Sequence, residues 1–324
     1  MNSRSRLLAA LVVAASVVTA CSGAASVPPL SGVTSEIPPA NPSVSASAQA
    51  SASAEAPASA QASAPLTGLL AKIKSSGQFL CGTSQEPPLS QVDTSTSLAT
   101  GALPDILNEF LRREGIDVKL TGTATPFASL IPALQSGRIQ IICDSMFIRP
   151  ERAAVIDFTE TTFYNTGSLD VAKGNPENLH TLSDLCGKSA GTYEGSTYVD
   201  LLKTVSGQCP SGKSINIQLY PTLQNVISDL VAGRIDAGVF DASLSGYALK
   251  QNPSLNFELV PDYVASDRST SNCAFGLAKG NQDFIAAFNS VYTGMVQDGT
   301  VGKIFAKWGL NPSAFFLQGV DGFQ

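Results

Sequence analysis

The same helix–strand pattern occurs twice in this chain, and this repeat limits the fold more than any other feature. Residues 134–145 read LQSGRIQIICDS, and residues 230–241 read LVAGRIDAGVFD, 96 positions later. In both copies an apolar helical pattern ends at a glycine, an arginine follows, and a run of strand-forming residues ends in an acid. The preceding helix also repeats, since Phe127 corresponds to Leu223. We therefore expect two lobes of the same architecture; the alternative is a chance similarity between two common α–β turns.

Strand and helix patterns alternate around both copies. Around the first copy we expect strands at 78–84, 118–122 and 139–143 and helices at 104–114 and 126–136. Around the second copy we expect strands at 189–193, 215–220 and 235–240 and helices at 196–205 and 223–230. This alternation predicts α/β lobes, each built on a parallel sheet.

The segment after residue 271 has no counterpart in the second copy. Its pattern indicates a strand at 272–281, a long helix at 283–296 and a short helix within 298–310. The simplest arrangement returns these elements to the first lobe. The lobes would then comprise residues 67–168 plus 271–324 and residues 169–270, joined by a hinge at two crossings, near 166–170 and 268–273.

The first 21 residues have the pattern of an export signal. Two arginines precede an uncharged run of twelve residues, Leu7 to Val18, which is too short to span a bilayer as a permanent helix. The stretch VTAC that ends at Cys21 also resembles the bacterial lipoprotein signal, in which the cysteine becomes the lipidated N-terminus. We therefore predict a signal peptide over 1–21 and a palmitate-bearing anchor on Cys21; the alternative is an ordinary secretory cleavage site beside a cysteine.

Residues 22–66 have the composition of a flexible tether. They contain no aromatic residue and only two charged ones, and 19 of the 23 residues from Ser43 to Pro65 are alanine, serine or proline. Such a segment cannot bury enough apolar surface to offset the entropy lost on ordering. From Thr67 onward about 258 residues remain, which is enough for two core-forming lobes, and no stretch among them has transmembrane length.

Charge and metal-ligand content narrow the functional classes. A formal net charge of −6, a pI near 4.9 and the absence of a basic run argue against nucleic acid and against an electrostatic membrane patch. The single histidine, His180, stands alone and no CxxC occurs, so we expect neither a metal nor a cofactor.

Five cysteines follow Cys21. Cys186 and Cys209 flank one strand–helix unit, and we expect them to form a disulfide in an oxidising compartment. The other three lie in predicted strands, so we expect one further pair and one buried free thiol; the pairing stays open among Cys81, Cys143 and Cys273.

Seven segments carry a more specific signal through their order and spacing. They read CGTSQEPPL, TGALPDI, PFASLIPALQSGRIQIICDSMFIRPERAAVIDFT, DLCGKSAGTYEGST, DLVAGRIDAGVFD, CAFGLAKGN and DGTVGKIFAKWG. Together they resemble the extracytoplasmic solute-binding proteins of amino-acid ABC importers, solute-binding family 3, over residues 67–312. The block from Leu134 to Thr159 is the most specific part of this resemblance.

This resemblance implies a fold and a function. The fold is the bilobal periplasmic-binding-protein fold (type II), with two α/β lobes that close on a small solute. The function is extracytoplasmic capture of an amino acid or related small zwitterion and its delivery to the permease subunits of an ABC importer. We expect a monomer without enzymatic activity that contacts the membrane through its lipid anchor only.

Two oppositely charged residues are the leading candidates for the binding site. The resemblance implies that Arg152 grips the α-carboxylate of the ligand, for which a guanidinium fork is suited because it forms two parallel charged hydrogen bonds. It implies equally that Asp241, at the end of the second copy, meets the α-ammonium. The alternatives are an ordinary surface salt bridge for Arg152 and a helix cap for Asp241. On opposite lobes, these charges would let a zwitterion favour the closed form.

Further candidates lie at predicted strand ends and helix starts. Phe127 matches an aromatic residue that stacks on the ligand, although it also fits a core position of its helix. The other candidates are polar groups at strand ends, backbone amides and residues at helix N-termini: Thr83, Glu86, Asp144, Ser145, Phe147, Tyr193, Ser196 and Thr197. Ser196 and Thr197 would look the same in sequence if they only capped a helix.

The chain departs from the family pattern at the expected pocket wall. Glu86 stands where many relatives have Tyr or Phe, Phe147 where they have a small Ser or Thr, and Arg149 where they have Thr. Three acids, from Glu86, Asp144 and Asp241, then face Arg152, which favours a ligand with an additional positive or donor group, because buried carboxylates without a partner are costly. Neutralisation of one acid by Arg149 would remove this preference.

Two other functions compete with solute transport. A cyclohexadienyl or prephenate dehydratase on the same fold would need a positioned acid or base, and Glu86 is the unusual candidate. A ligand-sensing module normally continues into a transmembrane segment, and we expect none here.

Overall fold

The computed structural model describes residues 66–261, 263 and 271–315. The predicted signal peptide, the anchor at Cys21, nearly all of the predicted tether and half of the second predicted crossing therefore lie outside the described residues. Within the described part of the chain, no helix is both long and apolar enough to cross a membrane.

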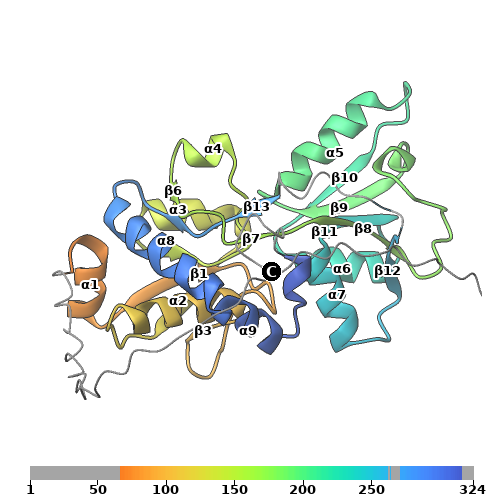
Figure 1. The fold of residues 1–324 in the computed structure, drawn as a ribbon. Coiled ribbons are helices and arrows are strands. Elements are labelled where there is room, and N and C mark those ends of the chain that lie inside the picture. The colour runs from red at the N-terminus through yellow and green to blue at the C-terminus, as the bar shows by residue number, and fades with distance from the viewer. Residues whose placement is uncertain (1–65, 262, 264–270, 316–324) are drawn as a thin grey trace, which may run out of the picture. The chain divides into compact units, whose positions relative to one another are not determined.

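The first lobe is built on a five-stranded sheet with the order β4-β1-β5-β14-β6 (Figure 1). β1 runs parallel to β4 and β5, whereas β14 is antiparallel to both β5 and β6. The strands are β1 (Phe79–Thr83), β4 (Leu120–Ala124), β5 (Ile141–Ile142), β6 (Asp157–Phe158) and β14 (Gly276–Leu277), with a small ribbon of β2 (Gln91–Val92) and β3 (Ala99–Thr100). The helices are α1 (Gly68–Ser76), α2 (Ala102–Arg113), α3 (Leu130–Gln135), α4 (Pro150–Ala153), α8 (Gln282–Gln297) and α9 (Thr300–Lys307).

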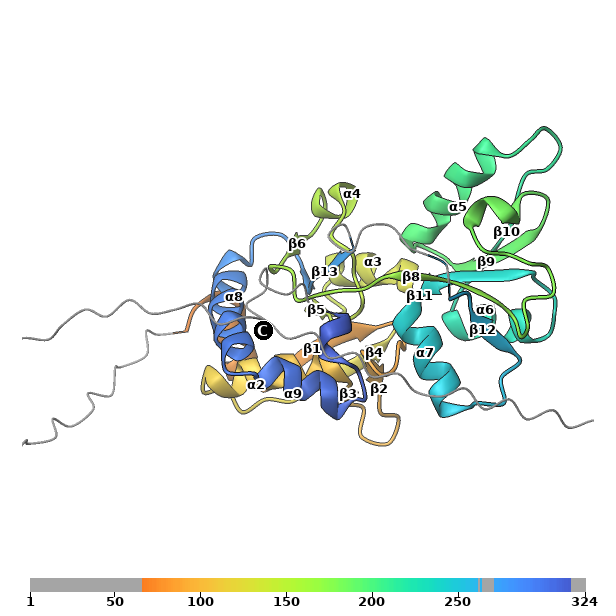
Figure 2. The ribbon, with the colours of Figure 1, turned by 45° about the vertical axis from the view of Figure 1, so that its right-hand side comes forward.

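The second lobe has a sheet of corresponding order, β10-β9-β11-β8-β12. β9 is parallel to β10 and β11, and β8 is antiparallel to β11 and β12. The strands are β8 (Gly167–Ala172), β9 (Ser189–Tyr193), β10 (Asn216–Tyr220), β11 (Ala237–Asp241) and β12 (Phe257–Leu259). The helices are α5 (Thr197–Gln208), α6 (Leu223–Val231) and α7 (Ala242–Gln251); Figure 2 shows α6 and α7 beside β11 and β8.

The repeat seen in the sequence is a repeat of packing. In the first lobe a Cβ added to Gly82 on β1 would lie 2.4 Å from Ile139, the second residue after the repeated glycine. In the second lobe a Cβ added to Gly191 on β9 would lie 2.5 Å from Ile235, which holds the same place in the second copy. β1 and β9 therefore each carry a glycine because the isoleucine of the repeat occupies the space of a side chain.

The two lobes are joined by paired strands. β7 (Phe163–Tyr164) and β13 (Asn272–Cys273) form an antiparallel ribbon, and the Asn165 amide next to it donates to the Ser271 carbonyl at 2.9 Å. Residues 163–165 and 271–273 are thus tied together by backbone hydrogen bonds.

The C-terminal helices pack on the first lobe, where α2, α8 and α9 lie together (Figure 1). Their core contains Phe110, Phe284 and Phe288, all fully buried, with the Phe110 ring 5.3 Å from each of the other two rings. Burying each phenylalanine stabilises the fold by about 1.5–3 kcal/mol.

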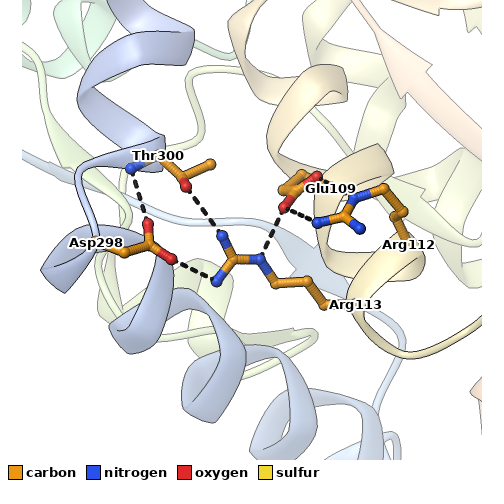
Figure 3. A network of polar contacts seen from close by, with 5 residues as sticks. All are labelled: Glu109, Arg112, Arg113, Asp298 and Thr300. Atoms are coloured by element: carbon orange, nitrogen blue, oxygen red, sulfur yellow. Dashed lines mark hydrogen bonds and ion pairs between the residues drawn. The ribbon is translucent and has the colours of Figure 1, made fainter.

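A polar network closes the rim of this helical layer (Figure 3). Arg113 on α2 contacts Glu109 at 2.8 Å, Asp298 at 2.8 Å and Thr300 at 2.9 Å, while Arg112 bonds to Glu109 from the other side. Arg113 therefore links α2 to the turn between α8 and α9.

One local expectation was wrong in detail. The strand predicted at 272–281 is divided into β13 and β14, because the chain passes there from the hinge ribbon into the first sheet. Thr67 is the N-cap residue of α1, and its hydroxyl donates to Asp283 at 3.1 Å. Ser196 is the N-cap residue of α5, and its side chain makes no capping bond.

The disulfide between Cys186 and Cys209 is confirmed, with a Cα–Cα distance of 5.5 Å. The pairing that the sequence left open is resolved as a Cys81–Cys143 disulfide, which joins β1 to the end of β5 with a Cα–Cα distance of 5.8 Å. Cys273 on β13 is the buried free thiol.

Candidate functional site

Polar side chains converge at the carboxyl ends of β1, β5 and β11. Thr83 ends β1 and Glu86 follows it, Asp144 and Ser145 follow β5, and Asp241 ends β11. All five residues are buried, with exposed fractions of 2 % or less. In open α/β sheets this edge is where ligands bind. The first and second lobes therefore both contribute side chains to one candidate binding site.

Ser84 positions two of the three acids. Its backbone N–H donates to Asp144 Oδ2 at 2.6 Å, and its hydroxyl donates to Glu86 Oε1 at 3.1 Å. The Ser145 amide points to Glu86 Oε2 at 3.4 Å. Glu86 and Asp144 are therefore held beside each other by the loop after β1 and the turn after β5.

Asp241 is held from within the second lobe. The Tyr198 hydroxyl, on α5, donates to Asp241 Oδ1 at 2.5 Å. Asp241 also occupies the N-cap position of α7, but its side chain makes no capping bond. The helix-cap alternative therefore does not explain where this carboxyl points.

Burial shifts the proton affinity of all three acids in the same direction. Burial and the neighbouring charges of Asp144 and Asp241 raise the pKa of Glu86 well above its usual value. Burial also raises the pKa of Asp144, and it raises the pKa of Asp241 to about 7 although Tyr198 opposes the shift. The cause is the same for each, because a low-dielectric site disfavours the charged form and like charges add to that cost.

Arg152 lies at the contact between the lobes. Its Nη1 donates to the Phe147 carbonyl at 2.9 Å in the first lobe, and its Nη2 donates to the Gly195 carbonyl at 2.9 Å in the second. The residue is only 8 % exposed, and burial lowers the pKa of its guanidinium. The alternative of an ordinary surface salt bridge does not describe this buried arginine.

Aromatic rings surround the arginine and pair across the lobes. The Arg152 guanidinium lies over the Phe127 ring, 5.4 Å from its centroid. Phe127 in turn meets Tyr193 edge-on at 5.3 Å, and Phe147 meets Tyr198 edge-on at 6.3 Å. Each pair joins a first-lobe residue to a second-lobe residue, so these rings form the apolar part of the closed interface.

Two cavities lie along the contact between the lobes, and Arg152 lines one of them. One, of about 240 Å³, is lined by Arg152, Gly195, Ser196 and Thr197 among others. The other, of about 100 Å³, is lined by residues that include Phe147, Thr197 and Tyr198. Neither is lined by Glu86, Asp144 or Asp241, so the predicted residues fall into an acidic group and an arginine group.

Three further candidates make only local contacts or none with the charged groups. The Thr83 hydroxyl accepts from the Gln85 amide at 3.1 Å, within its own turn. Ser196 Oγ lies 3.1 Å from Thr192 Oγ1, and Thr197 is half-buried. Among the described residues, no group of three His, Cys, Asp or Glu side chains is arranged to hold a metal ion.

Residues 79–311 match the bacterial extracellular solute-binding proteins, family 3. The chain belongs to this family. It is 32 % identical over 207 residues to the lysine/arginine/ornithine-binding periplasmic protein of Escherichia coli K12. The aligned segment covers 63 % of this chain and 76 % of the relative. It is 28 % identical over 243 residues to the L-cystine-binding protein TcyJ of the same organism, covering 74 % and 86 %. The solved structure of an ancestral arginine-binding protein bound to arginine matches with a TM-score of 0.63 and 28 % identity. The match covers 72 % of this chain and 98 % of that one.

Sequence reasoning missed several residues that shape the site of this solute-binding protein. They are Ser84, Asn165, Gly195 and Tyr198. Ser84 and Gly195 lie within quoted motifs, so their positions were signalled although their bonds were not. Tyr198 directly follows the N-terminal candidates of α5, but its bond to Asp241 spans 43 residues of sequence.

Proposed function

We propose that this protein binds an amino acid between its two lobes and delivers it to an ABC importer. The carrying observation is that Arg152 and Asp241 are both buried in a family 3 fold, Arg152 at the contact between the lobes and Asp241 at the end of β11 in the second lobe. The α-carboxylate would bind Arg152 and the α-ammonium would bind Asp241. The remaining candidates of the sequence analysis are proposed as the walls of the same site.

Arg152 keeps donors for a ligand. A guanidinium has five N–H donors, and the bonds to Phe147 and Gly195 use one on each terminal nitrogen. Three N–H groups are left, which suffice for the two parallel bonds that a carboxylate accepts. The guanidinium also lies over the Phe127 ring, where a cation–π contact favours its position.

Ligand binding and lobe closure are coupled in this proposal. Closure brings the Gly195 carbonyl to Arg152 and the Gln85 carbonyl to the Gln224 amide at 3.1 Å. A zwitterion that touches both lobes stabilises the closed form only through contacts that the open form lacks. Arg152 and Asp241 supply such contacts because they belong to different lobes.

We propose that the mature protein is a monomer anchored outside the cytoplasm through a lipid on Cys21. The sequence before Cys21 supports this proposal, as does the family's extracellular role. Substitution Cys21→Ser should release the protein from washed membranes into the soluble fraction. Retention of that variant on the membrane would contradict the anchor.

Calorimetric titration with all twenty amino acids tests the binding function. We expect stoichiometric binding, and Arg152→Ala should weaken it roughly 10- to 100-fold, since a lost charge-assisted bond costs about 1.5–3 kcal/mol. The matched control is Arg138→Ala, which removes an exposed arginine. Thermal unfolding checks that both variants fold; unchanged affinity in folded Arg152→Ala would remove this residue from the site.

One observation favours an enzyme as second candidate. The buried carboxyl of Glu86, whose pKa burial raises, has the character of a general acid. A dehydratase would convert prephenate or arogenate, with loss of turnover in Glu86→Gln. We propose that the protein has no such activity, and turnover that disappears in this variant would overturn the transport function.

A further inference from the structure

The acidic group of the site carries more negative charge than the α-ammonium of an amino acid needs. Asp241 alone can serve that ammonium. Glu86 and Asp144 then remain, each 1 % exposed, in a site where burial disfavours their charge. Buried acids of this kind are stable only with a partner.

The bonding of the acids leaves free acceptors at the site. Ser84 occupies Asp144 Oδ2 and Tyr198 occupies Asp241 Oδ1. Asp144 Oδ1 and Asp241 Oδ2 are buried and have no hydrogen-bond partner among the described residues. Two unpartnered carboxyl oxygens, one from each lobe, mark places where a bound cation would gain strong hydrogen bonds.

The groups around Glu86 and Asp144 do not neutralise these two acids. Glu86 and Asp144 lie near Asp241 from β11 and Tyr193 from β9, and Glu86 also lies near the thiol of Cys273 from β13. Each of these groups is acidic or uncharged.

The arginines are engaged elsewhere. Arg149 lies over the Phe147 ring at 5.6 Å, and Arg152 bonds to two carbonyls. The neutralisation by Arg149 that the sequence left open is therefore not seen.

We propose that Glu86 and Asp144 form the subsite for a second cationic group, so that the ligand is a dibasic amino acid. Asp144 Oδ1, with Glu86 beside it, receives the side-chain ammonium or guanidinium, and Asp241 receives the α-ammonium. This inference rests on the proposed binding function and specifies its substrate class. Ornithine, lysine and arginine belong to that class.

The subsite exchanges a proton for the ligand's cation. Without a cation, two carboxyls held side by side share a proton, because both cannot stay charged in a buried site. When the side-chain cation binds, it takes the place of that proton, which leaves for the solvent. Binding of a dibasic ligand near pH 7 is therefore accompanied by proton release.

The decisive comparison uses ligands of nearly equal shape. Arginine and citrulline differ mainly in the charge of the side-chain end, and lysine and norleucine differ likewise. We expect each cationic member to bind at least about tenfold more tightly by calorimetry. Equal binding of citrulline and arginine, or preference for a neutral amino acid, would overturn the inference and leave the binding function standing. Failure of every amino acid to bind would overturn both.

Variants of the subsite sharpen the test. Asp144→Asn and Glu86→Gln should bring the arginine-to-citrulline affinity ratio to within about threefold of unity, mainly through weaker arginine binding. Asp170→Asn, which alters a buried acid of the second-lobe core, should leave the ratio unchanged. Calorimetry in two buffers of different ionisation heat should show proton release that is lost in Glu86→Gln. A ratio that survives in a folded Asp144→Asn variant would remove Asp144 from the subsite.

Discussion

Asp170 should make the free energy of unfolding fall as the pH rises. It lies fully buried on β8, where the hydroxyls of Ser168 and Ser245 both donate to its Oδ2 at 2.5 and 3.0 Å. Its Oδ1 is buried without a hydrogen-bond partner among the described residues. Burial raises the pKa of this carboxyl from 3.8 to about 7, so the folded protein holds a proton that the unfolded chain has lost.

The sign and size of the effect follow from proton linkage. Between the two pKa values the folded state binds more protons than the unfolded state, so stability decreases with rising pH. The slope reaches about 1.4 kcal/mol per pH unit, and the cost of ionising Asp170 grows by roughly 2–3 kcal/mol between pH 5 and pH 8.5. Asp170→Asn should abolish this pH-dependent cost, because an asparagine resembles the protonated acid and can still accept hydrogen bonds from Ser168 and Ser245.

Chemical unfolding of both proteins between pH 5 and pH 8.5 measures the difference. We expect the free energy of unfolding of the variant, relative to that of the natural protein, to increase by roughly 2–3 kcal/mol from pH 5 to pH 8.5. Asp157→Asn is a control without a slope in this range: although partial burial opposes it, Lys279 lowers the pKa of Asp157 below 3.8, so its contribution is constant between pH 5 and pH 8.5 and is lost only at lower pH. A difference between Asp170→Asn and the natural protein that stays constant with pH would refute the reasoning.

Three further perturbations have defined outcomes. Gly195→Ala should weaken amino-acid binding by about tenfold or more, since its φ is +78° and its Cβ would lie 2.9 Å from the Ala128 backbone of the other lobe. Gly212→Ala, at φ +75° with open space around it, is the control, and equal effects on binding would contradict the closure argument. Asp241→Asn should weaken amino acids more than their deaminated analogues in the same titration, and equal weakening would exclude an ammonium partner. Arg113→Ala should lower the free energy of unfolding by about 1 kcal/mol, whereas substitution of the exposed Arg112 by alanine should lower it less. Denaturant midpoints that rank the two variants the other way would contradict the network of Figure 3.

The same network gives a pH dependence in acid. Hydrogen bonds from Arg112 and Arg113 lower the pKa of Glu109 to about 2. A lowered carboxyl pKa contributes stability that is present above the unfolded value and is lost as the pH falls toward 2. Glu109 therefore lowers the stability as the pH falls, whereas Asp170 lowers it as the pH rises.

Much of the fold could be predicted because it depends on local sequence patterns. The repeated glycine, arginine and isoleucine placed β5 and β11 correctly, and Gly82 and Gly191 pack against the two isoleucines, Ile139 and Ile235, in the same way. The disulfide between Cys186 and Cys209 followed from one strand–helix unit. Such features depend on residues close in sequence.

The rest could not be predicted because it depends on tertiary distance. The Cys81–Cys143 pairing follows only once β1 and β5 are neighbours. Thr83, Asp144 and Asp241 lie at the ends of strands as predicted, yet the partners of these side chains were not predicted, since Tyr198 reaches Asp241 between neighbouring elements of the second lobe. Likewise the sequence left open whether Arg149 neutralises an acid, and only the packing of Phe147 showed where its guanidinium lies.

A crystal structure of the protein with the tightest-binding amino acid of the calorimetric panel tests the central claim most directly. The account predicts closed lobes, with the α-carboxylate within hydrogen-bond distance of the Arg152 guanidinium and the α-ammonium within that distance of the Asp241 carboxyl. A ligand bound elsewhere, or bound with its carboxylate away from Arg152, would contradict it.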